Sequence, residues 1–443
     1  MLLFSLMVVF LLIMLYCIFL LKMHSKSIPF LILFLVYMFW DFVSIVYIDN
    51  GAYISEQNSY SYFTGASFRF VMIMLPFVLG APILFSLFTK SCSLMKSRMI
   101  LFEIKENIMS KIILTFSLLL CGYLILDEIV SGIPLFHQEI TQFNFYNTYS
   151  RLPLAEFLAG IFLGYLLLVC GIFFAKKKSF SNKVPYVIVY VLTIVYRIFL
   201  GEKFYPFLVL TIEFFIPTLI MSFDINYKSI ISILKRNSKW IKRMIIFIAI
   251  LLYVVYYKYS KEQSATYGSA IEHLISRAFA LQSHTFWGFD NYIVINDYGF
   301  DFNRIMQEML SGLQGVDKLD SSYGLTRIMY IVSPKSIVDM YIGNSTRFYG
   351  GYWTVALGCF GYYMAIIYSL LMALVFAFIS SILYSTIKNR EYFIMFIAFM
   401  GYFNFFKYFN EGDFIFLLST RMLISVGILV FYRIIKKVKY KRS

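Results

Sequence analysis

Four arginines lie in one polar segment of a chain that is otherwise mostly apolar. The segment runs from Lys258 to Gly350, about ninety residues. Its arginines are Arg277, Arg304, Arg327 and Arg347. The planar guanidinium stays charged at all ordinary pH values and forms two parallel hydrogen bonds with a phosphate group. The segment therefore predicts an anionic, phosphate-bearing ligand.

The first candidate site lies on an amphipathic helix expected over Ser269–Leu281. Its apolar residues recur at helical spacing, which leaves Glu272, His273 and Arg277 together on the polar face. Arg277 would stabilise negative charge on a leaving phosphate, and Glu272 or His273 would act as general base. The alternative is an ordinary solvated helix face. A second amphipathic helix is expected over Arg304–Leu313, and both helices fit the membrane surface or packing onto other helices.

Arg347 is the second catalytic candidate, because it precedes a long apolar run that begins near Trp353. Its alternative role is contact with the membrane interface. Arg304, Arg327 and His284 are candidates for substrate binding, although loop arginines are commonly surface residues and His284 fits a buried, hydrogen-bonded histidine. The carboxylates near His284 match no calcium-loop spacing, so no metal and no cofactor are expected.

Charged residues inside apolar runs form a third group of candidates. Burying a charge in a bilayer costs a few kcal/mol unless the charge is paired. Arg197, Arg421 and Glu213 lie in such runs, and Lys203 lies in a tight turn after Arg197. They indicate either a structural ion pair, such as Arg197 or Arg421 with Glu213, or a site for a lipid-linked phosphate that includes Arg197, Arg421 and Lys203.

Composition places these residues in a membrane protein. The chain is 60% hydrophobic and only 14% charged, against about 25% charged residues in a soluble protein. Its net charge of +15 comes mostly from short loops beside apolar runs, which the positive-inside rule explains without a nucleic-acid partner. We expect an all-α polytopic membrane protein with the lipid bilayer as a partner.

Eleven membrane spans are expected, with one large periplasmic loop between spans 8 and 9. They are Leu2–Leu21, Ile28–Ile48, Phe70–Phe88, Ile112–Val130, Leu154–Ala175, Val184–Leu200, Phe204–Phe223, Met244–Tyr257, Trp353–Leu383, Tyr392–Phe409 and Phe414–Ile434. Residues 1–257 then hold spans 1–8, residues 258–350 the loop, and residues 351–443 spans 9–11 with a basic tail. Alternate loops are rich in Lys and Arg, which predicts an N-terminus outside the cell and a C-terminus in the cytoplasm.

This layout resembles the O-antigen polymerases, the Wzy-type oligosaccharide repeat-unit polymerases. The resemblance is carried by the large late loop, by the basic stretch ISRAFAL near its start, and by Ser-Thr-x-x-x-Gly-Gly-Tyr followed by Leu-Gly-x-x-Gly at its end. Gly201-Glu202-Lys203 is similar to a Gly-x-Arg turn between two central spans of that family, with lysine here.

The resemblance implies a metal-independent glycosyltransferase at the periplasmic face. A growing glycan on undecaprenyl pyrophosphate would be transferred to the next lipid-linked repeat unit, building O-antigen or a related surface polysaccharide of the lipopolysaccharide pathway. A chain-length regulator and a flippase are candidate partners.

Four other functions remain open at this point, of which a non-enzymatic structural membrane protein is the least specific and is disfavoured by the charges inside apolar runs. An O-antigen ligase shares the donor and differs in its acceptor, lipid A-core. A flippase for lipid-linked oligosaccharide should show paired halves and no large loop. A metal-dependent lipid-sugar glycosyltransferase should carry a close pair of acids in its first outer loop, where only the separated Asp49 and Glu56 occur.

Overall fold

The computed structural model describes residues 15–52, 54, 56–58, 62–93, 106–137, 140, 142, 144–177, 179, 181–202, 204–223 and 279–442. Within these ranges the regular structure is entirely helical. The first half contains η1 (Ser25–Ser27), α2 (Ile28–Asp49), α3 (Ala66–Ser93), α4 (Glu106–Ser131), η2 (Phe145–Tyr149), α5 (Ala155–Phe157), η3 (Leu158–Phe162), α6 (Leu163–Lys176), α7 (Val184–Phe199) and α8 (Phe204–Phe223). The second half contains α12 (His284–Asn296), α13 (Phe302–Gln314), α14 (Gly324–Val332), α15 (Lys335–Gly343), α16 (Tyr352–Asn389), α17 (Tyr392–Glu411), α18 (Phe414–Leu418) and α19 (Thr420–Arg442).

Six helical stretches in the described part of the chain are long and apolar enough to cross a membrane. They are Ser25–Asp49, Ala66–Lys90, Ile108–Ser131, Ala155–Lys176, Tyr352–Asn389 and Tyr392–Glu411. Two shorter apolar helices, Val184–Phe199 and Pro206–Met221, complete the set. An α-helix satisfies its own backbone hydrogen bonds, so it can pass through lipid without exposing unpaired polar groups. The chain is therefore a multi-pass helical membrane protein.

One predicted span is interrupted in the structure, and two others lie partly or wholly outside the described residues. Phe414–Ile434 is interrupted, because Ser419 is extended (ψ 147°) and its hydroxyl accepts a hydrogen bond from the Met422 N–H, which begins α19 as a new helix. The structure describes the helix that contains Leu2–Leu21 only from residue 15, and Met244–Tyr257 lies outside the described residues.

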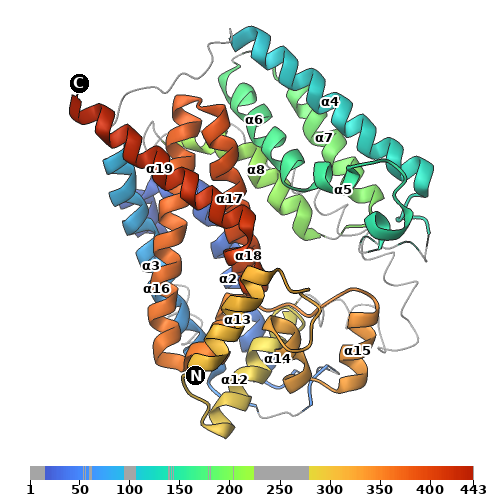
Figure 1. Ribbon diagram of the computed structural model, residues 1–443, viewed down its shortest axis with the longest axis vertical. Coiled ribbons are helices and arrows are strands. Elements are labelled where there is room, and N and C mark those ends of the chain that lie inside the picture. Colours follow the sequence, from blue (N-terminus) through green and yellow to red (C-terminus); the bar gives the residue numbers. More distant parts are fainter. Residues whose placement is uncertain are drawn as a thin grey trace.

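The helices form three groups (Figure 1). One is a bundle of α2, α3, α16, α17 and α19, in which α3 runs alongside α16. A second group holds α4 to α8. The third consists of the short helices α12 to α15 at one end of the bundle. Small residues allow the close approach of α3 and α16: a Cβ on Gly80 would lie 3.4 Å from the Ala373 Cβ.

The core of the bundle is aromatic. The ring of Phe34 on α2 packs against Phe376 of α16 and Phe409 of α17, with ring centroids 5.0 Å and 4.7 Å away. Both pairs meet edge to face, which is a preferred geometry for aromatic rings. These contacts hold α17, which carries several residues of the candidate site, at a fixed height in the bundle.

The two ends of the molecule differ in chemistry. At one end His24 contacts Ser86, Lys436 pairs with Glu391, and the Tyr165 hydroxyl donates to the Tyr392 carbonyl. These contacts place Lys26 before α2, Lys90 near the end of α3, Lys388 near the end of α16 and Lys436 of α19 at one end. Residues 279–350 cover the opposite end (Figure 1).

A kink in α16 fastens this covering segment to the bundle. Gly361 adopts φ +65° and ψ −178° inside the helix, a conformation that L residues rarely adopt. Near this break the Cys359 carbonyl accepts a hydrogen bond of 3.1 Å from the Asp301 N–H. The start of α13 is therefore fixed to the first turns of α16.

Candidate functional site

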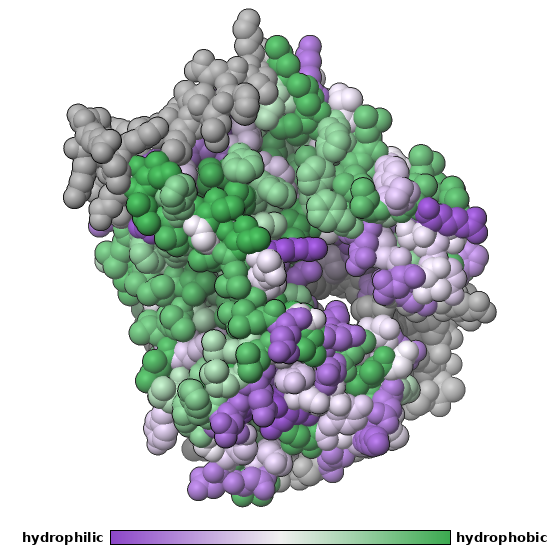
Figure 2. Space-filling view, viewed as in Figure 1, coloured by the Kyte–Doolittle hydropathy of each residue, from purple (hydrophilic) through white to green (hydrophobic). Residues whose placement is uncertain are grey.

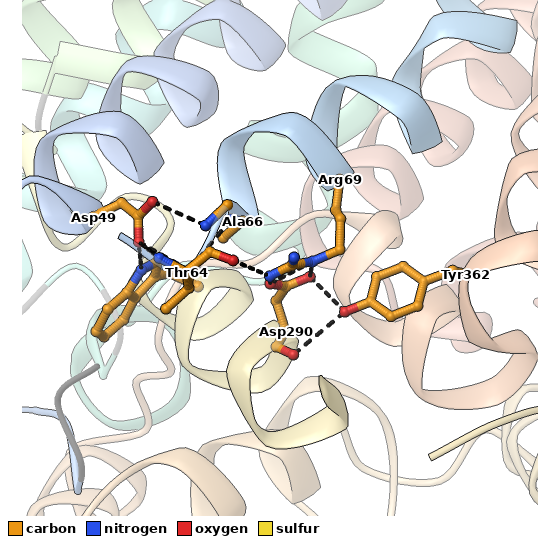
Figure 3. Close-up of polar contacts among 8 residues, drawn as sticks. Asp49, Thr64, Ala66, Arg69, Asp290 and Tyr362 are labelled. Carbon is orange, nitrogen blue, oxygen red and sulfur yellow. Dashed lines mark hydrogen bonds and ion pairs between the residues drawn. The ribbon is translucent and has the colours of Figure 1, made fainter. Parts of the chain in front are cut away.

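One buried polar centre joins α3, α12 and α16 (Figure 3). The Arg69 Nε donates to Asp290 Oδ1 at 3.0 Å, and its Nη2 donates to Asp290 Oδ2 at 2.5 Å. The Tyr362 hydroxyl also donates to Asp290 Oδ1 at 2.7 Å. The Asp290 side chain is 0% exposed and Arg69 is 26% exposed. The charge of this arginine is thus matched by a carboxylate of the same protein.

A second carboxylate beside this centre also has hydrogen-bond partners on both of its oxygens. Asp49, the last residue of α2, accepts hydrogen bonds from the Thr64 N–H, the Thr64 hydroxyl and the Trp287 indole N–H, at 2.8, 2.8 and 3.0 Å. Its other oxygen accepts from the Gly65 N–H at 3.3 Å. Two filled carboxylates that join four helices indicate a structural role, since little capacity remains for a ligand.

A third centre surrounds Arg347. Its Nη1 donates to Asp413 Oδ2 and its Nη2 to Glu411 Oε2, each at 2.5 Å, and Nη1 also reaches the Lys318 carbonyl at 3.1 Å. The exposed fractions of the side chains are 6% for Arg347, 8% for Asp413 and 31% for Glu411. Arg347 is therefore buried behind its two carboxylates, and Glu411 is the most exposed member of the cluster.

Burial and charge act against each other in this cluster. Burial raises the pKa of the Asp413 carboxyl, although the Arg347 guanidinium and the N–H of Leu325 oppose that rise. Burial alone would lower the pKa of Arg347, but Asp413 and Glu411 more than offset it, so that its pKa is raised. Arg347 consequently stays charged and holds both carboxylates in place.

The turn between α17 and α18 has little freedom. Gly412 adopts φ +76°, and a Cβ there would lie 2.8 Å from Val355 Cγ2 and 3.0 Å from the Gly351 carbonyl oxygen. Only glycine fits both the conformation and the space. The positions of Glu411 and Asp413, on either side of this glycine, are fixed by the backbone as well as by Arg347.

A small pocket of about 20 Å³, room for about one water molecule, lies beside this turn. Its lining includes Glu308, Ser311, Asp317, Lys318 and Asp413. Glu308 is fixed by an ion pair with Arg304 and by the Gly324 N–H at 2.9 Å. Burial raises the pKa of Glu308, and Arg304 opposes the rise. Arg304 thus stabilises the wall of the pocket.

A group of cations lies on the other side of the turn. Lys407 of α17 is half-buried, interacts electrostatically with Lys318, Arg421 and Arg197, and is attracted to Glu411. Its ammonium lies 5.1 Å and 5.8 Å from the ring centroids of Phe403 and Phe416. Among the residues that the structure describes, no carboxylate forms an ion pair with Lys318, Lys407 or Arg421. Lys318, Lys407 and Arg421 are named the cation cluster below.

Figure 2 shows the surface hollowed next to these elements, between the α4–α8 group and the α12–α15 group, with hydrophilic residues around the hollow. Arg421 is the second residue of α19, where the positive end of the helix dipole disfavours a cation by a few tenths of a kcal/mol to about 1 kcal/mol. Its placement is unfavourable for stability alone. Positive charges gathered in this way attract anions to the nearby surface.

Arg197 approaches the same region from α7. Its Nη1 pairs with Glu202 at 2.5 Å and its Nη2 donates to the Ala159 carbonyl at 2.7 Å. The carboxylate partner is therefore Glu202 in the following turn, whereas the ion pair suggested by the sequence involved Glu213. Both oxygens of the buried Glu128 lack a hydrogen bond within the described structure, and this carboxyl interacts electrostatically with Arg197 and Glu202.

The remaining candidates from the sequence lie apart from the cation cluster or outside the described residues. Glu272, His273, Arg277 and Lys203 lie outside them. His284 is buried with its ring centroid 4.6 Å from that of Phe348, and burial lowers its pKa. Arg327 is half-buried and interacts with Tyr298 and Asp301.

Sequence reasoning did not identify Lys318, Lys407, Glu411, Asp413 or Arg69. Lys407, Glu411 and Asp413 lie within seven residues of one another between two apolar runs. Their density in so short a connection is the signal that could have revealed them. Within the described residues, no group of three or more His, Cys, Asp or Glu side chains is placed to hold a metal ion.

One comparison with known proteins gives a match. Residues 318–426 match a protein family of unknown function, DUF6418. No curated protein and no solved structure matches the chain. The matched stretch begins at Lys318 and also contains Arg347, Lys407, Glu411, Asp413 and Arg421, whereas Arg69 and Arg197 lie outside it.

Proposed function

We propose that this chain is a membrane glycosyltransferase that polymerises undecaprenyl-pyrophosphate-linked oligosaccharide repeat units. The growing glycan is transferred from one lipid pyrophosphate to the next repeat unit, and lipid pyrophosphate is released. The product is an O-antigen or a related surface polysaccharide, as the resemblance of the sequence to O-antigen polymerases suggests.

The observation that carries this proposal is the cation cluster at the hollow. A pyrophosphate leaving group gains negative charge as its bond to the sugar breaks, so the enzyme needs fixed positive charges at that position. Lys318, Lys407 and Arg421 lack carboxylate partners among the described residues, which leaves their charge available to a ligand. The saturated pair of Arg69 and Asp290 has no such capacity.

The height of the cluster in the bundle fits a lipid-linked substrate. Lys407 lies one helical turn before the end of α17, an apolar helix long enough to span a bilayer. A phosphate bound there would lie at the depth of lipid headgroups, with its polyprenyl chain among apolar helices. The exposed carboxylate of Asp317 lies beside Lys318 and can accept hydrogen bonds from sugar hydroxyls.

In this proposal the chain is a bacterial inner-membrane protein. Residues 279–350 face the periplasm, and the basic end of the bundle faces the cytoplasm. The position of Lys26, Lys90, Lys388 and Lys436 at one end of the described helices supports this orientation. Eleven spans, with residues 258–350 as one periplasmic loop, are part of the proposal.

The reaction can be tested with the purified chain in proteoliposomes. An undecaprenyl-pyrophosphate-linked repeat unit is supplied as donor and acceptor, and glycan length is followed by gel electrophoresis. We expect a ladder of products at repeat-unit spacing. If no ladder forms with this acceptor but glycan appears on added lipid A-core, the activity is ligation and not polymerisation. No transfer to either acceptor would contradict glycosyl transfer itself.

A further inference from the structure

We propose, on the basis of the function proposed above, that Glu411 is the general base that deprotonates the acceptor sugar hydroxyl. Glu411 is the last residue of α17, one helical turn beyond Lys407, and its side chain is 31% exposed. One of its oxygens, Oε2, is held by Arg347. The other, Oε1, has no hydrogen-bond partner among the described residues and is available to a ligand.

The neighbouring carboxylates are already occupied. Asp413 uses Oδ1 for the Leu325 N–H and Oδ2 for Arg347, and its side chain is 8% exposed. Glu308 is 2% exposed and is filled by Arg304 and the Gly324 N–H. Glu202 is paired with Arg197 and is 13% exposed. Glu411 therefore combines a free oxygen with greater exposure than these other carboxylates have.

Position and orientation also suit a base. A general base must reach the hydroxyl proton within hydrogen-bond distance, in a fixed geometry. Arg347 and the tight turn at Gly412 hold the carboxylate in place, so it needs little rearrangement when substrate arrives. Glu411 follows Lys407 by one helical turn of α17, which places the base next to the proposed pyrophosphate position.

The step balances in atoms and electrons. The Glu411 carboxylate takes the proton from the acceptor hydroxyl while the hydroxyl oxygen forms a bond to the anomeric carbon of the donor glycan. The bond between that carbon and the phosphate oxygen breaks, and its electron pair leaves with the lipid pyrophosphate beside the cation cluster. Arg347 acts as a positioning residue in this step.

The charged and titratable groups around Glu411 come from several elements. Arg347 and Tyr349 precede α16, Lys407 belongs to α17, and Asp413 follows Gly412. Lys318, Arg421 and Arg197 surround Lys407 on its other sides. To assign an acid limb in the pH–rate profile to Glu411, a variant must therefore remove this carboxylate specifically.

The test compares the parent with Glu411→Gln, which keeps a hydrogen-bond acceptor for Arg347 and removes the base. Two quantities are measured in proteoliposomes: binding of undecaprenyl pyrophosphate and the pH–rate profile of glycan extension. In Glu411→Gln we expect extension to fall by about 10²–10⁴-fold, binding to stay within about threefold, and the acid limb to disappear. Asp413→Asn, which alters the other carboxylate on Arg347, should keep the acid limb.

The outcomes distinguish the assignment of Glu411 as the base from the proposed function. If the parent extends glycan and Glu411→Gln does so at a similar rate with the same acid limb, Glu411 is not the base and the proposed function stands. If Asp413→Asn also loses the acid limb, the effect belongs to the ion-pair cluster, which contradicts the assignment. A parent that neither extends glycan nor binds the lipid pyrophosphate overturns both proposals.

Discussion

Arg69 and Asp290 form a forked ion pair between α3 and α12, although 221 positions separate them in the sequence. Asp290 is fully buried, and Tyr362 of α16 donates to the same carboxylate. The pair therefore fastens the covering helices to the bundle at the end where the cation cluster lies.

Removing one partner of this pair should destabilise the protein. Asp290→Asn leaves the half-buried Arg69 without its counter-charge and should lower the free energy of unfolding by about 2–3 kcal/mol, the lower end for a buried pair because Arg69 keeps some contact with water. The measurement is the thermal unfolding midpoint in detergent. Asp339→Asn, at an exposed carboxylate bound by Tyr330, is the matched control and should leave the midpoint nearly unchanged. Equal midpoints for the two variants would contradict a structural role for Asp290.

Arg347 should behave as a residue that stabilises its cluster. Arg347→Ala leaves the buried Asp413 and the half-buried Glu411 without counter-charge, so we expect protein abundance to fall together with activity. Arg347→Lys should recover part of the abundance and less of the activity, because a single ammonium does not reproduce a fork that holds two carboxylates. Quantitative immunoblotting of membranes, with extension assays on equal amounts of protein, separates the two effects. Full abundance of Arg347→Ala with all activity lost would favour direct contact between Arg347 and substrate.

Acid should weaken the covering helices through His284. Burial lowers the pKa of this histidine below its ordinary value of 6.5, while the interaction with Glu56 opposes the shift. The unfolded state therefore binds more protons between the two pKa values. The stability contribution is full above about pH 6.5 and is lost as pH falls through the folded pKa.

Unfolding midpoints between pH 7.5 and 5 check this prediction. The parent should lose at most about 1.4 kcal/mol per pH unit from this group, and His284→Gln should remove that part of the pH dependence. His137→Gln, at an exposed histidine, is the control. An unchanged pH dependence in His284→Gln would show that another group is responsible.

Topology can be checked by cysteine labelling in intact cells, using a chain whose five native cysteines are replaced. An impermeant reagent should label a cysteine at Asp317 and leave one at Lys177 unlabelled until the membrane is opened. The reverse pattern would invert the orientation and place the cation cluster on the cytoplasmic side.

Much of the helical architecture could be predicted from the sequence, because long apolar runs and basic connections reflect the constraints of a bilayer. Ile28–Ile48 and Phe204–Phe223 match α2 and α8 to within a residue. The break at Ser419 was not predictable in this way, because a single serine in an apolar run leaves mean hydropathy almost unchanged and acts through one hydrogen bond.

The candidate site was harder to predict, because it depends on which charges are already paired. Arg347 and Lys407 are both cations near the end of an apolar run, and sequence alone does not tell them apart. Packing does: Arg347 lies behind Glu411 and Asp413, whereas Lys407 has aromatic neighbours and no ion pair within the described structure. Partners distant in sequence, such as Lys318 and Arg421, become visible only in the fold.

The central claim is that the cation cluster binds a lipid pyrophosphate, and binding of undecaprenyl pyrophosphate to the purified chain tests it most directly. Lys407→Ala and Arg421→Ala should each weaken binding by about 10–100-fold, since each removes one charge-assisted contact. Undecaprenol, which lacks phosphate, should bind equally to all variants. Lys335→Ala, at an exposed lysine on α15, should match the parent. If Lys407→Ala and Arg421→Ala bind undecaprenyl pyrophosphate as tightly as the parent does, the cluster is not the anion site.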